Sequence, residues 1–99
     1  MAALSPTYQE ILDLRNGRFL VVSLVTVTNG SDTLALPEGL TTSTGRVTVI
    51  PVDSSHTAKT VSSISQSAHP QGATVTMTGG TNSSQQYVLS FHVGNTAGL

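Results

Sequence analysis

The chain contains no cysteine and no tryptophan, and it has few charged residues. Without cysteine it can form neither a disulfide framework nor a thiolate metal site. Four basic and five acidic residues make 9 charged positions in 99, whereas an ordinary globular domain is about 25% charged. Four basic residues and a net charge of −1 do not form the basic surface that nucleic acids or an anionic membrane require. We therefore expect neither nucleic acid nor membrane as a partner.

Long hydrophobic runs are also missing. The longest apolar stretch, residues 19–27, is interrupted by Ser23 and Thr26 and is far shorter than the roughly 20 residues of a membrane-spanning helix. The first six residues lack the basic and apolar regions of a signal peptide. We therefore expect the protein to be made and kept in the cytoplasm, or assembled there into a particle that leaves the cell by lysis.

The chain is rich in hydroxyl groups instead of charges. Its 13 serines and 15 threonines make up more than a quarter of the residues. Apolar residues make up 37%, which is too many for a typical disordered chain. A chain of this length forms one domain with a modest core, and self-association is a common way of stabilising such a domain.

An alternation with a period of two begins at residue 18 and predicts β-strands. The clearest long strand, residues 19–28, is apolar on both faces over most of its length. Its two apolar faces consist of Phe19, Val21, Val25 and Val27 on one side and of Leu20, Val22 and Leu24 on the other. Such a strand is typical of a sheet that is covered on both sides. We therefore expect the second face to be covered either by the N-terminal segment or by another copy of the protein.

Further strands complete an all-β chain. The other predicted strands are residues 34–36, 46–53, 61–67, 73–78 and 87–93. Pro51 lacks a backbone donor and is expected on an edge strand or at a bulge. Short strands without intervening helices predict a small β-sandwich or a jelly-roll-like barrel of about five to seven strands.

The last two predicted strands are expected to pair as a hairpin across residues 79–84. In the second of them, Tyr87, Leu89 and Phe91 are expected to face the core. His92 has the opposite parity and is expected to face solvent or an interface. The expected outward residues of the preceding strand are Thr74, Thr76 and Thr78.

Residues 1–17 are predicted to form a short helix or an arm. Ser5 is a suitable N-cap, Pro6 suits the first helical position, and Gly17 lies just beyond the expected end. The apolar residues with helical spacing are Leu4, Tyr8, Ile11 and Leu12. The expected organisation is thus a helix or arm (1–17), a single β-sandwich domain (18–94) and a flexible C-terminal tail (95–99).

The sequence has no pattern that is typical of catalysis or of cofactor binding. His56, His69 and His92 lack the spacing of metal ligands, and the acidic residues stand in separate segments. Neither the G-x-S-x-G motif of a nucleophile elbow nor a phosphate-binding loop occurs. We therefore predict no catalytic, metal or cofactor site and expect no enzymatic activity. A hydrolase with a Ser–His pair is the enzymatic alternative, and the sequence does not indicate which pair it would use.

The order of segments between residues 17 and 94 resembles that of a family of virus proteins. The segments are residues 39–42 (GLTT), 46–51 (RVTVIP), 72–80 (GATVTMTGG) and 87–94 (YVLSFHVG). In this order they resemble the small β-rich structural proteins of tailed bacteriophage virions, particularly capsid decoration (cement) proteins. The resemblance implies attachment to a shell of major capsid protein, commonly as trimers on three-fold positions, which reinforces the shell. It implies no catalytic residues.

The leading hypothesis from the sequence is a non-enzymatic virion structural protein that self-associates, as a trimer, and docks on a larger protein lattice. The residues expected to pack against a partner are Leu4, Tyr8, Ile11, Leu12, Leu20, Val22 and Leu24. The alternative is a tail, fibre or surface binding module that recognises a host glycan or protein. Its binding loops would be residues 53–60 and 79–85.

Overall fold

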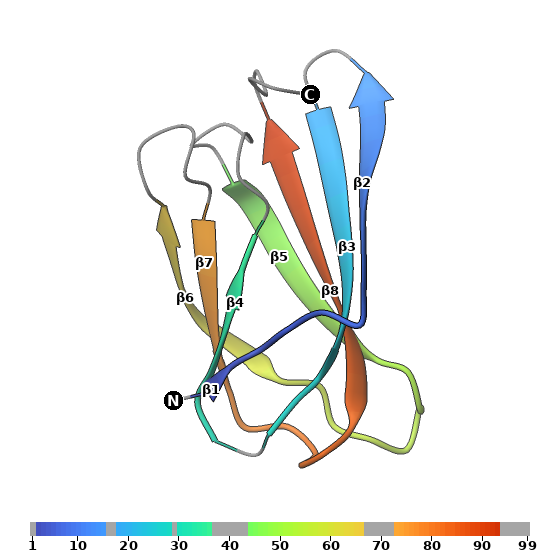
Figure 1. The fold of residues 1–99 in the computed structure, drawn as a ribbon, viewed down its shortest axis with the longest axis vertical. Coiled ribbons are helices and arrows are strands. Elements are labelled where there is room, and N and C mark those ends of the chain that lie inside the picture. The colour runs from blue at the N-terminus through green and yellow to red at the C-terminus, as the bar shows by residue number, and fades with distance from the viewer. Residues whose placement is uncertain (1, 16–17, 29, 37–43, 67–72, 94–99) are drawn as a thin grey trace.

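The computed structural model describes residues 2–15, 18–28, 30–36, 44–66 and 73–93, and these form a β-sandwich (Figure 1). Two four-stranded sheets have the strand orders β1-β4-β7-β6 and β2-β3-β8-β5. The strands are β1 (Ala2–Ala3), β2 (Tyr8–Arg15), β3 (Arg18–Thr26), β4 (Asp32–Ala35), β5 (Thr44–Pro51), β6 (Thr60–Gln66), β7 (Ala73–Thr78) and β8 (Gln85–Val93). The all-β prediction is confirmed. β5 is an edge strand of its sheet, as expected from Pro51.

The N-terminal segment forms strands, and the helix predicted for residues 1–17 is wrong. β2 pairs antiparallel with β3, and β1 runs parallel to β4, so the segment contributes to both sheets (Figure 1). The apolar spacing that fits a helix face also fits a strand, in which Tyr8 and Leu12 share one side and Ile11 takes the other. Pairing with β3 decides between the two, because a helix this short is marginal without a partner. The predicted tail, 95–99, lies outside the described residues.

The core lies between the two sheets and is mostly aliphatic. Its buried members are Val21, Val25, Val27, Leu34, Leu36, Ala73, Val75, Met77 and Val88. The partly buried side chains that pack against them are Leu4, Ile11, Val47, Val49 and Val61. The inward face of β3 is thus the one that carries Val21 and Val25, and its other apolar face points away from the sandwich.

The last two strands do not form the predicted hairpin. β7 pairs with β4 and β6, whereas β8 pairs with β3 and β5 in the other sheet. The connection between them crosses from one sheet to the other, and Gly79, Gly80 and Ser83 adopt positive φ angles there of 73°, 80° and 57°. Glycine adopts positive φ angles readily. They allow the chain to change direction here without forming a two-residue hairpin turn.

The parity predicted for β8 is also wrong. Val88, Ser90 and His92 face inward and are buried, with His92 only 1% exposed, while Tyr87 and its neighbours of the same parity face outward. Register explains the inversion, because residues paired across strands share a face. Val21 of β3 is paired with Ser90, so both point into the core. Tyr87, Leu89 and Phe91 are more hydrophobic than the buried set, but this difference does not decide which side of β8 faces the core.

A buried ion pair ties the connection between β3 and β4 to the start of β6. Lys59 Nζ lies 2.7 Å from Asp32 Oδ2, and both side chains are fully buried. The ammonium group also donates to the carbonyl oxygens of Thr28 (2.7 Å) and Gly30 (2.6 Å). Burial raises the pKa of Asp32, but hydrogen bonds from Lys59 and Thr28 and the charge of Lys59 outweigh it, so that the pKa lies below its ordinary value. Every donor of the ammonium group therefore has an acceptor.

Candidate interaction surface

The outward side of the sheet β2-β3-β8-β5, called here the outer face, carries three rows of side chains. Pairing across the strands places the rows as Leu12–Leu20–Phe91, Glu10–Val22–Leu89–Thr48 and Tyr8–Leu24–Tyr87–Ile50. Most members are apolar because β3 and β8 each bring a hydrophobic residue to every row. The other side of the same strands faces the core, so this sheet is apolar on both sides.

Large apolar side chains on the outer face remain open to solvent. Tyr8 is 48% exposed, Ile50 45% and Tyr87 37%. Leu20, Val22 and Leu24 in the centre are half-buried by their neighbours on the sheet. A contiguous exposed apolar area of this kind is typical of a contact site for another protein.

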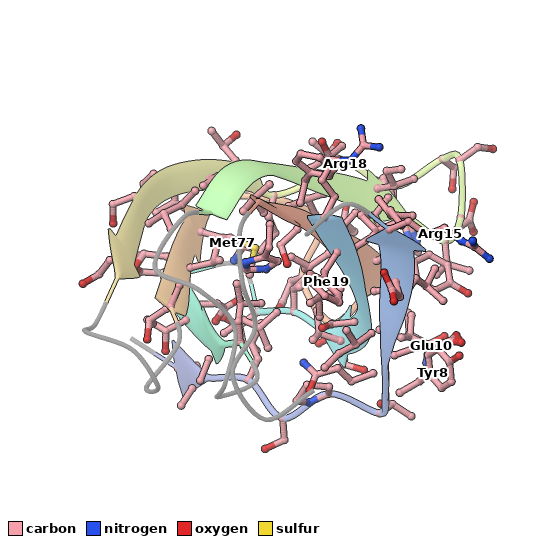
Figure 2. The ribbon with its side chains drawn as sticks, turned by 90° about the horizontal axis from the view of Figure 1, so that it is seen from above. Tyr8, Glu10, Arg15, Arg18, Phe19 and Met77 are labelled. Carbon is pink, nitrogen blue, oxygen red and sulfur yellow. The ribbon has the colours of Figure 1, made fainter. Side chains whose placement is uncertain are left out.

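The charges of the outer face lie at its margins. Glu10 stands on the edge strand β2, and its carboxylate accepts a hydrogen bond from the hydroxyl of Tyr8. That hydrogen bond is the main cause that raises the pKa of Tyr8 above its ordinary value. In Figure 2, Tyr8 and Glu10 point away from the sandwich, as do Arg15 at the end of β2 and Arg18 at the start of β3. The described side chains in the centre of the outer face, on β3 and β8, carry no charge.

The outward side of the other sheet is different in character. It carries hydroxyl groups in aligned positions, since Thr33 is paired with Thr76 and Thr76 with Ser63. The expectation that Thr74, Thr76 and Thr78 face outward is confirmed, since the residues between them are buried. The two outward sides thus differ: one is apolar, and the other is a neutral hydroxyl surface.

Five of the seven residues predicted to contact a partner lie together on the outer face. They are Tyr8, Leu12, Leu20, Val22 and Leu24. Leu4 and Ile11 are separated from them, because both pack against the core. The sequence reasoning missed Tyr87, Leu89 and Phe91, which were assigned to the core, and Ile50 on the edge strand. The register between β3 and β8 is the signal that would have found them.

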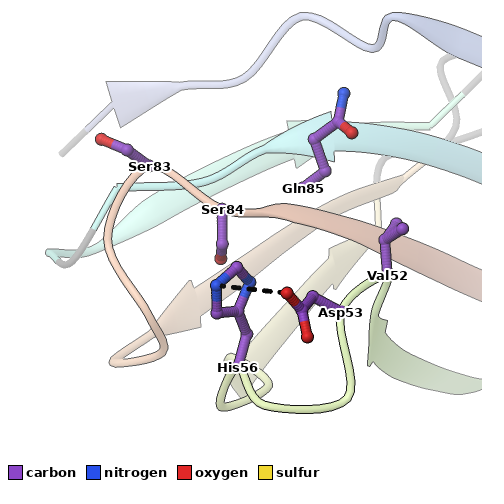
Figure 3. A pocket seen from close by; sticks show the side chains of 6 residues that line it. All are labelled: Val52, Asp53, His56, Ser83, Ser84 and Gln85. Carbon is purple, nitrogen blue, oxygen red and sulfur yellow. Dashed lines mark ion pairs between the residues drawn. The ribbon is translucent and has the colours of Figure 1, made fainter.

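The two loops predicted to bind a ligand in the alternative hypothesis lie side by side. The Thr57 amide donates to Thr81 Oγ1 (2.7 Å), and the Thr81 amide donates to the Thr57 carbonyl oxygen (3.1 Å). Between the loops lies an open pocket of about 250 Å³ (Figure 3). Its lining residues are Val52, Asp53, His56, Ser83, Ser84 and Gln85. His56 Nε2 and Asp53 Oδ2 face each other there at 4.0 Å.

Two Ser–His arrangements occur among the described residues, and both are engaged within the fold. Ser90 Oγ lies 3.0 Å from His92 Nε2, but both side chains are buried in the core, where no substrate reaches them. Burial also lowers the pKa of His92, which favours the neutral ring. Ser84, beside His56, donates its hydroxyl hydrogen to the Thr81 carbonyl oxygen at 2.6 Å. That hydrogen bond opposes transfer of the proton to a histidine base.

Comparison with protein-family models, with curated proteins and with solved structures gives no match for this chain. In the part of the chain that the structure describes, no three histidine, aspartate or glutamate residues gather to hold a metal ion. None of the described residues belongs to a helix of the length and hydrophobicity needed to cross a membrane.

Proposed function

We propose that this protein is a non-enzymatic structural protein that works by protein–protein contact through the outer face. The setting proposed for it is a virion, in which it self-associates and binds the major capsid protein shell as a decoration protein. The observation that carries the proposal is the apolar, centrally uncharged outer face. A surface of this composition can be covered by protein without the cost of removing a charge from water.

The exposed side chains indicate how strongly such a contact holds. Complete burial of a large apolar side chain contributes about 1.5–3 kcal/mol, so a side chain that is already half covered contributes about 1 kcal/mol. Four such residues on the outer face, Tyr8, Leu12, Ile50 and Tyr87, are 36–48% exposed. Their sum is of the same order as the freedom lost on association, roughly 4–15 kcal/mol. One contact is therefore weak, and it would form more readily where a repeating shell holds many copies close together.

Composition and chain order support the virion setting. The resemblance of residues 17–94 to phage decoration proteins rests on the order of their segments. Three of these segments coincide with strands β5, β7 and β8. A neutral hydroxyl surface on the opposite sheet suits close packing among neighbouring proteins for the same reason of low desolvation cost.

Quantitative peptide mass spectrometry of purified virions tests the setting. Hundreds of copies per particle are expected for a protein that decorates the shell. A few to a dozen copies would instead assign the protein to the tail or portal. Absence from the particle would overturn the virion setting.

A second candidate function is a binding module for a host glycan or protein, as part of a tail, a fibre or another virion surface. The specific observation in its favour is the pocket between residues 52–56 and 83–85. Binding on a glycan array that is lost in Asp53→Asn would support it, since the exposed carboxylate of Asp53 lines that pocket. Equal binding by the variant, or none by the wild type, would count against it.

A further inference from the structure

We infer that the outer face is covered by a second copy of this chain, packed face to face about a two-fold axis that runs parallel to the strands. The inference rests on the proposed self-association and specifies its geometry. It differs from the trimer that the family resemblance implies, because a contact that uses the same face on both copies closes as a dimer.

The composition of the outer face argues for a second copy as its partner. A partner must be apolar and uncharged opposite β3 and β8, where a charge would be removed from water without compensation. It must also match the twist of the sheet, because β-sheets are twisted and not flat. Another outer face meets both conditions, and two sheets pack well at about 10 Å with their strands within about 30° of each other.

The position of Glu10 selects the axis. A two-fold axis across the strands, through the middle row, would set Glu10 against Glu10 of the second copy, which places like charges together. An axis parallel to the strands keeps each row opposite itself but exchanges the margins, so β2 lies opposite β5. Glu10 then meets Thr48, whose hydroxyl can donate to the carboxylate.

The central strands also match in this arrangement. β3 of one copy lies over β8 of the other, so that Val22 meets Leu89 and Leu24 meets Tyr87 within the same rows. Arg18, at the start of β3, is exposed in the single chain and lies beyond the three rows. Eleven described side chains form the three rows, compared with about 20–30 residues on each side of a standard stable interface. The dimer is therefore weak and depends on concentration.

Substitution of Thr48 by charged residues tests the axis. Thr48 is exposed on an edge strand, so its variants retain the fold, which thermal melting verifies. Within one copy, Thr48 and Glu10 are three strand spacings apart, about 14 Å, where water and salt screen their interaction. In the dimer, Glu10 of each copy lies opposite Thr48 of the other copy, so this contact occurs twice. Thr48→Lys should therefore tighten dimerisation, about tenfold at low salt, and Thr48→Glu should weaken it by a similar factor.

Sedimentation velocity of the full chain from micromolar to millimolar concentration measures these dissociation constants. The double variant Glu10→Lys/Thr48→Glu should restore dimerisation relative to Thr48→Glu alone. A wild-type trimer, or weakening by both Thr48 variants, would overturn the proposed axis. A wild-type protein that stays monomeric at millimolar concentration would overturn the second copy as partner. If such a monomer still occurs in hundreds of copies per virion, the proposed function stands without this inference; if it is absent from virions, both fail.

Discussion

Loss of the buried Lys59 side chain is the perturbation whose effect on stability follows most directly from the structure. Lys59→Met keeps most of the aliphatic chain but removes the ammonium group. Asp32 then remains buried without its charged partner, and the carbonyl oxygens of Thr28 and Gly30 lose their shared donor. The substitution therefore leaves two carbonyl oxygens without their donor and a buried carboxylate whose charge is balanced only by its hydrogen bonds from Thr28.

The expected cost is large compared with the stability of a small domain. Removing one partner of a buried ion pair typically costs about 3–5 kcal/mol, because the remaining charge stays out of water. A domain of this size unfolds with a free energy of about 5–15 kcal/mol. Lys59→Met should therefore remove roughly a fifth or more of the total stability. Asp32→Asn should cost less, because an amide oxygen can still accept from the ammonium group and from Thr28.

Urea unfolding of the wild type, the two single variants and the double variant measures this effect. We expect the double variant Lys59→Met/Asp32→Asn to be less destabilised than the sum of the singles by about 1–3 kcal/mol, since the unpaired charge is absent. A loss below about 1 kcal/mol for Lys59→Met would refute the reasoning, because a pair that contributes so little is accessible to water.

Two further predictions concern pH and a close backbone approach. Burial lowers the pKa of His92 below its ordinary value of 6.5, so the unfolded chain binds the proton more readily. Stability should therefore be greatest above the ordinary pKa and fall as the pH is lowered below it, and the melting temperature of the wild type should fall more than that of His92→Gln over the same pH range. A Cβ at position 80 would lie 2.8 Å from Cγ of Lys59, and φ there is +80°. Gly80→Ala should therefore lower the melting temperature, whereas Gly30→Ala, where a Cβ meets nothing within 4 Å, should change it little; equal losses would contradict the role of the close contact.

Much of the strand pattern follows from the sequence, because alternation and turn residues mark the strands locally. The predicted strand at 73–78 matches β7, and residues 19–28 largely match β3. The prediction for the N-terminal segment was wrong because its apolar residues fit both the period of a helix and the period of a strand. Its pairing with β3 across the dipeptide Asn16–Gly17 is close in the sequence, but the spacing of the apolar residues within the segment does not reveal it. The dipeptide itself is a hairpin signal that was interpreted as the end of a helix.

The candidate surface could be predicted only in part. The two-sided character of β3 indicated correctly that Leu20, Val22 and Leu24 form a second apolar face. The contribution of β8 was assigned to the wrong side, because hydrophobicity favours Tyr87 and Leu89 as core residues when the strand is considered alone. Only the cross-strand register shows that they extend the apolar face of β3. The core can contain Val88, Ser90 and His92 instead, because Ser90 Oγ lies within hydrogen-bond distance of the polar ring of His92.

The central claim, that the outer face is a protein-binding surface, is tested most directly by one measurement of mass in solution. Ile50→Asp and Val22→Asp each place a charge on the outer face, and Thr76→Asp places the same charge on the hydroxyl side of the opposite sheet. Sedimentation equilibrium at high concentration should show self-association for the wild type and Thr76→Asp and a monomer for the two outer-face variants, with circular dichroism verifying that each is folded. Since Ile50 is 45% exposed, its variant tests the surface even if Val22→Asp unfolds. A folded Ile50→Asp variant that associates as strongly as the wild type would contradict the account.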